Sequence, residues 1–263
     1  MAMSTATSAD GTTIDYDAYG SGPAVVFIGG ATQFRAIDAR TTTAAKLLAE
    51  RGFTAVDYDR RGRGRSGDHP DWSVEREVAD VAALIAAVGG TATLYASSSG
   101  ATVALPAAAA GIGVTGLVLY EPPFFPGADN SDKITELRRL LDAGDHDAAM
   151  RHGLTAVIGV APEMVEGIAA SPAWPAMVSV APTLRYDFTA LNDITLDPDW
   201  PTRWAGVTVP VAVLSGDRTF PGMPEAADAV AAALPTATRT VLPGQDHGPE
   251  PRVLADALAA ILE

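Results

Sequence analysis

The sequence contains no cysteine. This absence excludes disulfide bonds, a thiolate nucleophile and zinc sites built on cysteine, and it fits the reducing cytoplasm, where we expect the protein to be located. Apolar runs of about 18 residues, the length needed to cross a bilayer, are also absent. Residues 1–11 lack the basic start and apolar stretch of a signal peptide. A membrane is therefore not an expected partner.

Basic residues are scarce. Lys and Arg total 18 against 32 Asp and Glu, which gives a formal net charge of −14. Nucleic acids attract clustered basic residues and repel a protein of this charge, so we expect no nucleic-acid partner. Hydrophobic residues make up 48% of the 263 positions. This proportion is typical of a globular protein and excludes a disordered chain.

Short apolar segments alternate with helical patterns along most of the chain, which predicts an α/β fold with a mostly parallel sheet and helices on both faces. The expected strands are residues 12–19, 24–28, 53–58, 91–96, 116–120, 209–215 and 238–242, and the expected helices between them are 41–51, 74–88, 99–110, 224–234 and 249–262. The stretch 122–205 has no strand pattern and contains two helical patterns, at residues 131–143 and 145–157. We therefore predict a core domain, residues 1–121 and 206–263, with a helical insertion at 122–205. A separate C-terminal domain is disfavoured, because it would have only two strands.

Ser98 lies where a predicted strand meets a predicted helix, as the nucleophile does in a nucleophile elbow. The tight turn requires small residues two positions before and after the apex. Ala96 and Gly100 meet this requirement for Ser98, and Ser99 also passes the size test. We prefer Ser98, because glycine best relieves the contact after the apex. A serine-rich loop that only caps the helix is the alternative.

A serine needs a base, and His247 follows the last predicted strand. Because parallel strands end at one edge of a sheet, His247 can approach Ser98. Asp217 follows the preceding strand and is the expected carboxylate that orients His247. Glu121, after the strand at 116–120, is a second candidate. The predicted catalytic residues are thus Ser98, His247 and Asp217.

The anion formed on an attacked carbonyl needs two hydrogen-bond donors. The backbone N–H of Ser99 is one candidate. The Gly29-Gly30 loop after an expected strand supplies the other, which we assign to Ala31, with Thr32 as the alternative. Loss of one such donor typically raises the barrier by about 3–4 kcal/mol.

Four segments together resemble the α/β-hydrolase fold family: the elbow at 96–100, the Arg/Gly loop at 59–66, residues 215–217 and residues 246–248. The resemblance covers nearly the whole chain apart from the insertion. It implies a serine hydrolase that acts through an acyl-enzyme, and it makes the insertion a helical cap over the site. The Arg/Gly loop corresponds to a structural turn in the family.

The sequence departs from the family pattern at two positions. Ala96 stands where glycine is usual, and Gly29 stands where many relatives have histidine. Ala96 is small enough to be tolerated, whereas the loss of the histidine affects the geometry of the oxyanion loop. A serine nucleophile excludes the members that use aspartate, the dehalogenases and epoxide hydrolases.

We expect an uncharged, partly apolar ester or other acyl group as the small-molecule substrate, with no metal and no cofactor, and a monomer or homodimer. Five large cap side chains are the expected pocket lining, although each could instead form the core of the cap: Phe124, Phe125, Trp174, Met177 and Trp204. Two alternatives remain open. The same residues could act in a cofactor-free perhydrolase (haloperoxidase-like) or a C–C hydrolase or lyase, and the protein could be a non-catalytic binding protein for a small ligand.

Overall fold

The computed structural model describes residues 4–263, with Pro201 by its backbone alone. This part of the chain contains one eight-stranded sheet in the order β1-β2-β4-β3-β5-β6-β7-β8. The strands are β1 (Ser4–Thr7), β2 (Thr13–Gly20), β3 (Ala24–Ile28), β4 (Thr54–Tyr58), β5 (Ala92–Ser97), β6 (Val114–Tyr120), β7 (Val211–Gly216) and β8 (Ala237–Leu242). Strand β2 pairs antiparallel with β1 and β4, and the remaining neighbours pair in parallel. The predicted α/β class is confirmed.

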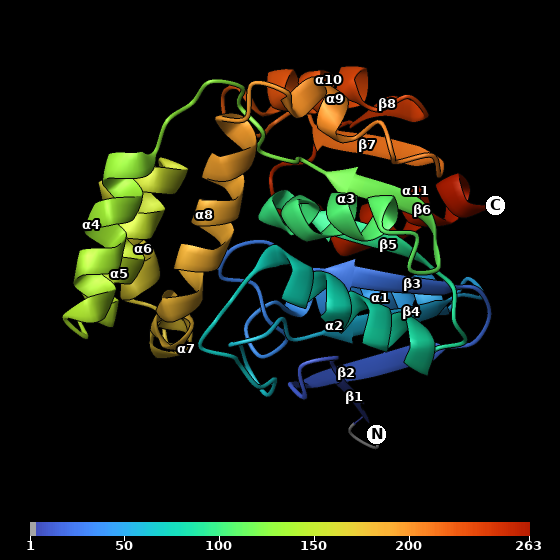
Figure 1. Cartoon of the computed structure of the whole chain (residues 1–263), viewed down its shortest axis with the longest axis horizontal. Coiled ribbons are helices and arrows are strands. Elements are labelled where there is room, and N and C mark those ends of the chain that lie inside the picture. Colours follow the sequence, from blue (N-terminus) through green and yellow to red (C-terminus); the bar gives the residue numbers. More distant parts are fainter. Residues whose placement is uncertain (1–3) are drawn as a thin grey trace.

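Helices cover both faces of the sheet (Figure 1). On one face lie α2 (Val74–Ala87), α3 (Ala101–Ala109) and α10 (Met223–Ala233), and on the other lie α1 (Ala39–Ala49) and α11 (Pro251–Leu262). Strand β3 is fully buried, because its successive side chains enter opposite hydrophobic cores: Val26 and Ile28 face α2 and α3, whereas Val25 and Phe27 face α1 and α11. A continuous apolar run is what such a central parallel strand requires.

The structure differs from the expected elements at the start of the chain. Strand β1 was not expected, and β2 is therefore not at the edge of the sheet. The β1 sequence Ser-Thr-Ala-Thr offers little apolar pattern, and its position is set by antiparallel pairing with β2. Pro106 lies inside α3, which continues past it to Ala109.

The segment between β6 and β7, which we call the inserted segment, consists of helices joined by loops. It contains α4 (Ser131–Asp142), α5 (His146–His152), a π-helical turn (Gly153–Ile158), α6 (Pro162–Ala169), α7 (Trp174–Ser179), a 3₁₀ turn (Ala181–Thr183), α8 (Leu184–Thr195) and α9 (Trp200–Arg203). Helices α4 to α8 lie beyond the carboxyl ends of the parallel strands (Figure 1).

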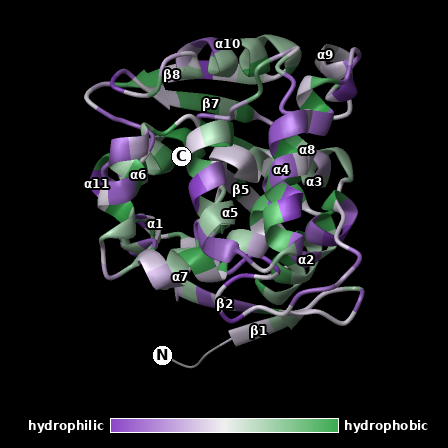
Figure 2. Cartoon of the chain, turned by 90° about the vertical axis from the view of Figure 1, so that its left-hand side faces the viewer, coloured by the Kyte–Doolittle hydropathy of each residue, from purple (hydrophilic) through white to green (hydrophobic). Residues whose placement is uncertain are grey.

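The inserted segment has a hydrophobic core of its own, which includes Leu137, Met150 and Leu184. Its helices α4 and α5 carry both hydrophilic and hydrophobic residues (Figure 2), as expected for helices that bury one side and expose the other. Among residues 4–263, no helix combines the length and apolar character that a bilayer crossing requires.

Candidate active site

Ser98 lies at the sharp turn between β5 and α3, and its backbone has a φ of 53°. Residues other than glycine rarely adopt this left-handed backbone conformation. The turn is tightly packed: a Cβ atom on Gly100 would lie 2.5 Å from the carbonyl oxygen of Ile28. Only glycine fits two positions after Ser98, and this close packing explains why the turn requires small residues on either side of its apex. Ser99 instead turns its hydroxyl to the buried carboxylate of Asp187, at 2.8 Å. Ser98 is therefore the residue at the apex.

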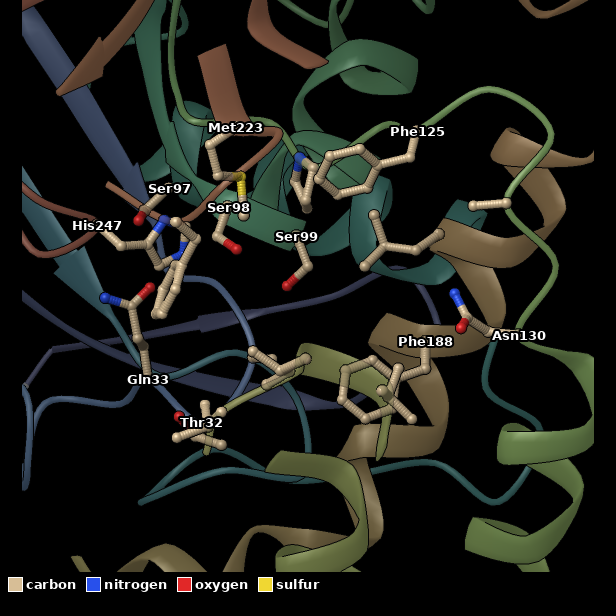
Figure 3. Close-up of a pocket in the computed structure, with 18 of the residues that line it drawn as sticks. Thr32, Gln33, Ser97, Ser98, Ser99, Phe125, Asn130, Phe188, Met223 and His247 are labelled. Atoms are coloured by element: carbon tan, nitrogen blue, oxygen red, sulfur yellow. The ribbon is translucent and has the colours of Figure 1, made fainter. Parts of the chain in front are cut away.

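His247 lies in the loop between β8 and α11 and lines the same cavity as Ser98. The two side chains lie close together at one end of this cavity (Figure 3). The edge of the His247 ring packs against Phe220, with 5.5 Å between the ring centres. Its Nδ1 atom is 2.5 Å from Oε2 of Glu121. This contact fixes the ring and leaves Nε2 free to face the cavity.

Glu121 follows directly after β6 and is fully buried, with a φ of 49°. Its carboxylate is held from three sides. Oε1 accepts a hydrogen bond from the N–H of Gly216 at 2.8 Å, and Oε2 accepts one from the hydroxyl of Thr219 at 2.6 Å besides its contact with His247. These donors keep the carboxylate aimed at the imidazole.

The carboxylate that contacts His247 is thus that of the second candidate, Glu121, and not that of Asp217 as we expected. Asp217 lies one residue beyond the end of β7 and accepts a hydrogen bond from the N–H of Gly244 at 2.6 Å, which stabilises the turn after β8. The left-handed backbone of Glu121 brings its side chain to the end of the adjacent strand β7, where Gly216 donates to it. The sequence spacing alone does not distinguish these two arrangements.

The Gly29-Gly30 loop lies next to the elbow. A Cβ atom on Gly30 would be 2.9 Å from Cβ of Ser98, so the backbone approaches the serine more closely than a side chain would permit. Ala31 and Thr32, the two candidates for the oxyanion donor, line the cavity together with Ser98 and Ser99. The N–H of Ala31 makes no hydrogen bond to any group of the described chain. It is therefore available to a ligand.

Backbone strain is concentrated at this site. Within the described chain, the non-glycine residues with positive φ are Thr32, Ser98 and Glu121, which lie after the Gly29-Gly30 loop, at the elbow and directly after β6. Each such conformation costs of order 1–3 kcal/mol and persists only where the surrounding structure enforces it. Strain of this kind clusters at functional sites.

The cavity has a volume of about 350 Å³. Its walls are mostly apolar side chains from the inserted segment and from the loops after β6 and β7; they are Phe125, Ala128, Val157, Ile158, Val160, Phe188, Leu191, Phe220 and Met223. Of its lining residues only His247 is ionisable, and Asn130 lies at the end opposite Ser98 (Figure 3). Among residues 4–263 there is no group of three or more His, Asp and Glu side chains arranged to hold a metal ion.

Of the five side chains expected to line the pocket, only Phe125 does so. Phe124 and Trp204 are buried in the hydrophobic core beside the sheet, and Trp174 and Met177 pack in the core of the inserted segment. The packing of the helices decides this, because an apolar side chain fits a core and a cavity wall equally well. Two elements that were not expected to line the cavity contribute Val157 and Ile158, from the π-helical turn, and Phe188 and Leu191, from α8.

Three charged residues beneath the site were not expected from the sequence. Arg60 and Arg63 belong to the Arg/Gly loop, which we expected to be a structural turn, and both bind Asp187 of α8. All three are at most 2% exposed. The loop pattern marks the arginines, but nothing in the sequence marks Asp187 as their partner.

Comparisons with known proteins agree with this fold. The model of the alpha/beta hydrolase family matches residues 25–258. The crystal structure of an alpha/beta hydrolase from Sphaerobacter thermophilus is 37% identical in sequence, covers 99% of this chain and 100% of that chain, and has a TM-score of 0.89. The chain therefore belongs to the alpha/beta hydrolase family. This confirms the predicted family and the predicted class of enzyme, a hydrolase.

More distant structures share the fold. A thermophilic esterase from Thermogutta terrifontis is 20% identical with a TM-score of 0.74, and the match covers 100% of this chain and 98% of that chain. A bromoperoxidase from Bacillus anthracis is 18% identical with a TM-score of 0.74, covering 99% of each chain. The search of curated proteins gives no match.

Proposed function

We propose that the protein is a serine hydrolase that cleaves an uncharged, partly apolar ester or other acyl substrate through an acyl-enzyme. The observation that carries this proposal is the position of Ser98 and His247 at one end of a single apolar cavity, with His247 held by the buried carboxylate of Glu121. A hydroxyl, an imidazole and a carboxylate in this order form the arrangement that activates a serine for acyl transfer.

In the proposed first step, Nε2 of His247 takes the proton of the Ser98 hydroxyl as Oγ attacks the carbonyl carbon. The carbonyl oxygen becomes an anion, and the N–H groups of Ala31 and Ser99 donate to it. His247 then gives its proton to the leaving alcohol as the carbon–oxygen bond breaks, which leaves the acyl group on Ser98. A water molecule, deprotonated by His247, then attacks the acyl group in the same way. This step releases the acid and restores the hydroxyl of Ser98.

Glu121 takes the role of the orienting carboxylate in this proposal, in place of Asp217. It accepts the Nδ1–H of His247, so the lone pair stays on Nε2, where the Ser98 proton must go. It also stabilises the imidazolium that forms during the reaction. The buried carboxylate needs no rearrangement, because Gly216 and Thr219 already hold it.

The substrate class follows from the walls of the cavity. No carboxylate, lysine or arginine side chain is among its lining residues, so an ionised acyl chain would be buried without a counter-ion. Aliphatic and aromatic side chains favour an apolar acyl or alkyl group. The inserted segment supplies much of this wall and would act as the cap of the site.

The decisive experiment replaces the proposed nucleophile. Ser98→Ala should fold normally and lose at least 1,000-fold in kcat on p-nitrophenyl esters, because no hydroxyl remains to form the acyl-enzyme. Ser97→Ala is the matched control: Ser97 is the neighbouring serine, also lines the cavity and has no role in the proposed reaction. Hydrolysis by Ser98→Ala at the wild-type rate would overturn the proposal.

Two alternatives are tested with the same protein. Peroxide in place of water would make the site a perhydrolase, and a bromoperoxidase is among the proteins with this fold. Formation of peracetate from acetate and hydrogen peroxide, at a rate exceeding ester hydrolysis, would favour that reaction.

A fluorophosphonate probe separates an enzyme from a binding protein, because it labels only an activated serine. Absence of labelling at Ser98 would favour a binding protein.

A further inference from the structure

Two arginines and two carboxylates form a buried, charge-balanced cluster beneath the elbow. Arg60 binds Glu77 through two hydrogen bonds of 2.7 Å each and binds Asp187 at 2.7 Å. Arg63 donates to the second oxygen of Asp187. Each of the four side chains is at most 2% exposed. Burial raises the pKa of Asp187, but Arg60 and Arg63 outweigh it and hold that pKa below its usual value, so Asp187 is an anion at neutral pH.

The same arginines bind the backbone of the oxyanion loop. Arg60 Nη1 donates to the carbonyl oxygen of Gly29 at 3.1 Å. Arg63 Nη1 donates to the carbonyl oxygen of Gly30 at 2.6 Å and to that of Gln33 at 3.1 Å. Asp187 also reaches the elbow, because its Oδ1 accepts the hydroxyl of Ser99 at 2.8 Å. The cluster thus contacts both segments that carry the proposed oxyanion donors.

The contact with Gly30 fixes the direction of one donor. The carbonyl of Gly30 and the N–H of Ala31 belong to one planar peptide unit, and no peptide bond in the described chain is cis. In a trans unit these two groups point in opposite directions. Arg63 holds this carbonyl at 2.6 Å, and the N–H of Gln33 also donates to it at 3.2 Å, so the N–H of Ala31 points away from both donors. The preceding unit is held as well, by Arg60 on the Gly29 carbonyl and by the Gln33 side chain on the N–H of Gly30.

We propose that Arg63, held by Asp187, is a positioning residue that orients the N–H of Ala31 as an oxyanion donor. Asp187 belongs to α8, so the inserted segment helps to set the geometry of the oxyanion site as well as lining the cavity. A buried ion pair contributes little to stability compared with apolar packing, which leaves orientation as the benefit of this cluster. The inference rests on the proposed function and assigns the arginine a task within it.

The test is Arg63→Lys. A lysine keeps the positive charge but has one ammonium group, which cannot hold Asp187 and the Gly30 carbonyl as the guanidinium fork does. Complete loss of an oxyanion donor lowers kcat by about 100- to 1,000-fold. For a misoriented donor we expect kcat to fall roughly 10- to 100-fold, with KM changed by less than about 3-fold. Binding of a trifluoromethyl ketone, which forms an oxyanion on Ser98, should weaken by the same factor as kcat.

The matched control is Arg61→Lys. Arg61 lies two positions earlier, is equally buried, and binds Asp80 through a fork of 2.8 and 2.6 Å, but it contacts neither the oxyanion loop nor Asp187. The two variants should lose similar stability in a thermal melt, while Arg61→Lys retains kcat within about 3-fold. A wild-type kcat in Arg63→Lys, or equal losses in both variants, would overturn the inference.

Two further variants keep the outcomes separate. If Arg63→Lys does not fold, Asp187→Asn keeps the shape of the side chain but removes the charge that holds Arg63. We expect its kcat to fall about 5-fold, as for loss of one ordinary hydrogen bond, and an unchanged value would refute the positioning role. Ser98→Ala tests the proposed function itself. An inactive Ser98→Ala with a fully active Arg63→Lys would contradict only the positioning role.

Discussion

At the scale of single residues, the site depends on local rules that the sequence displays and on orientations that it does not. The elbow was predictable, because the small residues around Ser98 are a requirement of neighbouring positions in the chain. The position of His247 was predictable from the end of its strand. The carboxylate partner was not, since Glu121 and Asp217 both follow strand ends. The backbone turn at Glu121 decides which of them reaches the imidazole.

This difference leads to a prediction at residue scale. Glu121→Gln should lower kcat by about 1,000- to 10,000-fold, because an amide can donate to Nδ1 and so favour the wrong tautomer of His247. Asp217→Asn is the matched control and should stay within about 3-fold of wild type, since its side-chain oxygen can still accept the N–H of Gly244. Steady-state hydrolysis of p-nitrophenyl esters measures both. A larger fall in kcat for Asp217→Asn than for Glu121→Gln would mean that Asp217 is the carboxylate that orients His247.

At the scale of elements, apolar periodicity predicted the central strands and the helices that cover them. It failed where an element depends on its partner, as β1 does on β2. It also joined α5 and the π-helical turn into one helix at 145–157, because hydrophobic spacing does not reveal a change in helical hydrogen bonding. Val157 and Ile158 at the end of that turn line the cavity. Such π-helical turns occur frequently at functional sites.

The cavity wall provides a prediction at this scale. Ile158 is 39% exposed, so Ile158→Trp should fold and fill part of the cavity. We expect kcat/KM to fall at least 10-fold for esters of long acyl chains and to change by less than about 3-fold for acetate esters, because only long chains reach the added ring. Met164→Trp, at a more exposed position of α6 away from the cavity, is the control and should leave the profile unchanged. An unaltered chain-length profile for Ile158→Trp would contradict the proposed acyl pocket.

At the scale of the whole molecule, the α/β class and the helical character of the inserted segment were predictable, because both follow from where strand patterns occur and where they stop. The lining of the cavity was not. An aromatic side chain such as Trp174 or Phe188 is equally apolar whether it faces a core or a cavity, and only the packing of the helices decides. The buried ion pair of Arg63 with Asp187 was also not predictable, because the two residues are 124 positions apart in the sequence.

One buried carboxyl affects the stability of the whole molecule. Burial raises the pKa of Asp57 on β4 to about 7. The hydroxyl of Thr42 donates to it at 2.6 Å and lowers this pKa, as does Arg35, whereas Asp38 and Asp59 raise it. In the unfolded chain an aspartate has a pKa near 4. Between about pH 4 and pH 7 the folded protein therefore retains a proton that the unfolded chain has lost.

The free energy of unfolding should consequently fall as the pH rises from 5 to 7, and the contribution of Asp57 to the slope is up to about 1.4 kcal/mol per pH unit. Asp57→Asn removes this contribution, so its stability should rise relative to wild type as the pH increases and level off above pH 7. Thr42→Val removes the donor that lowers the pKa of Asp57, so the fall should continue to a higher pH than in wild type. Urea denaturation at half-unit intervals from pH 5 to 8 measures all three proteins. Parallel curves for wild type and Asp57→Asn would mean that Asp57 ionises at the same pH in the folded and unfolded chains, in spite of its burial.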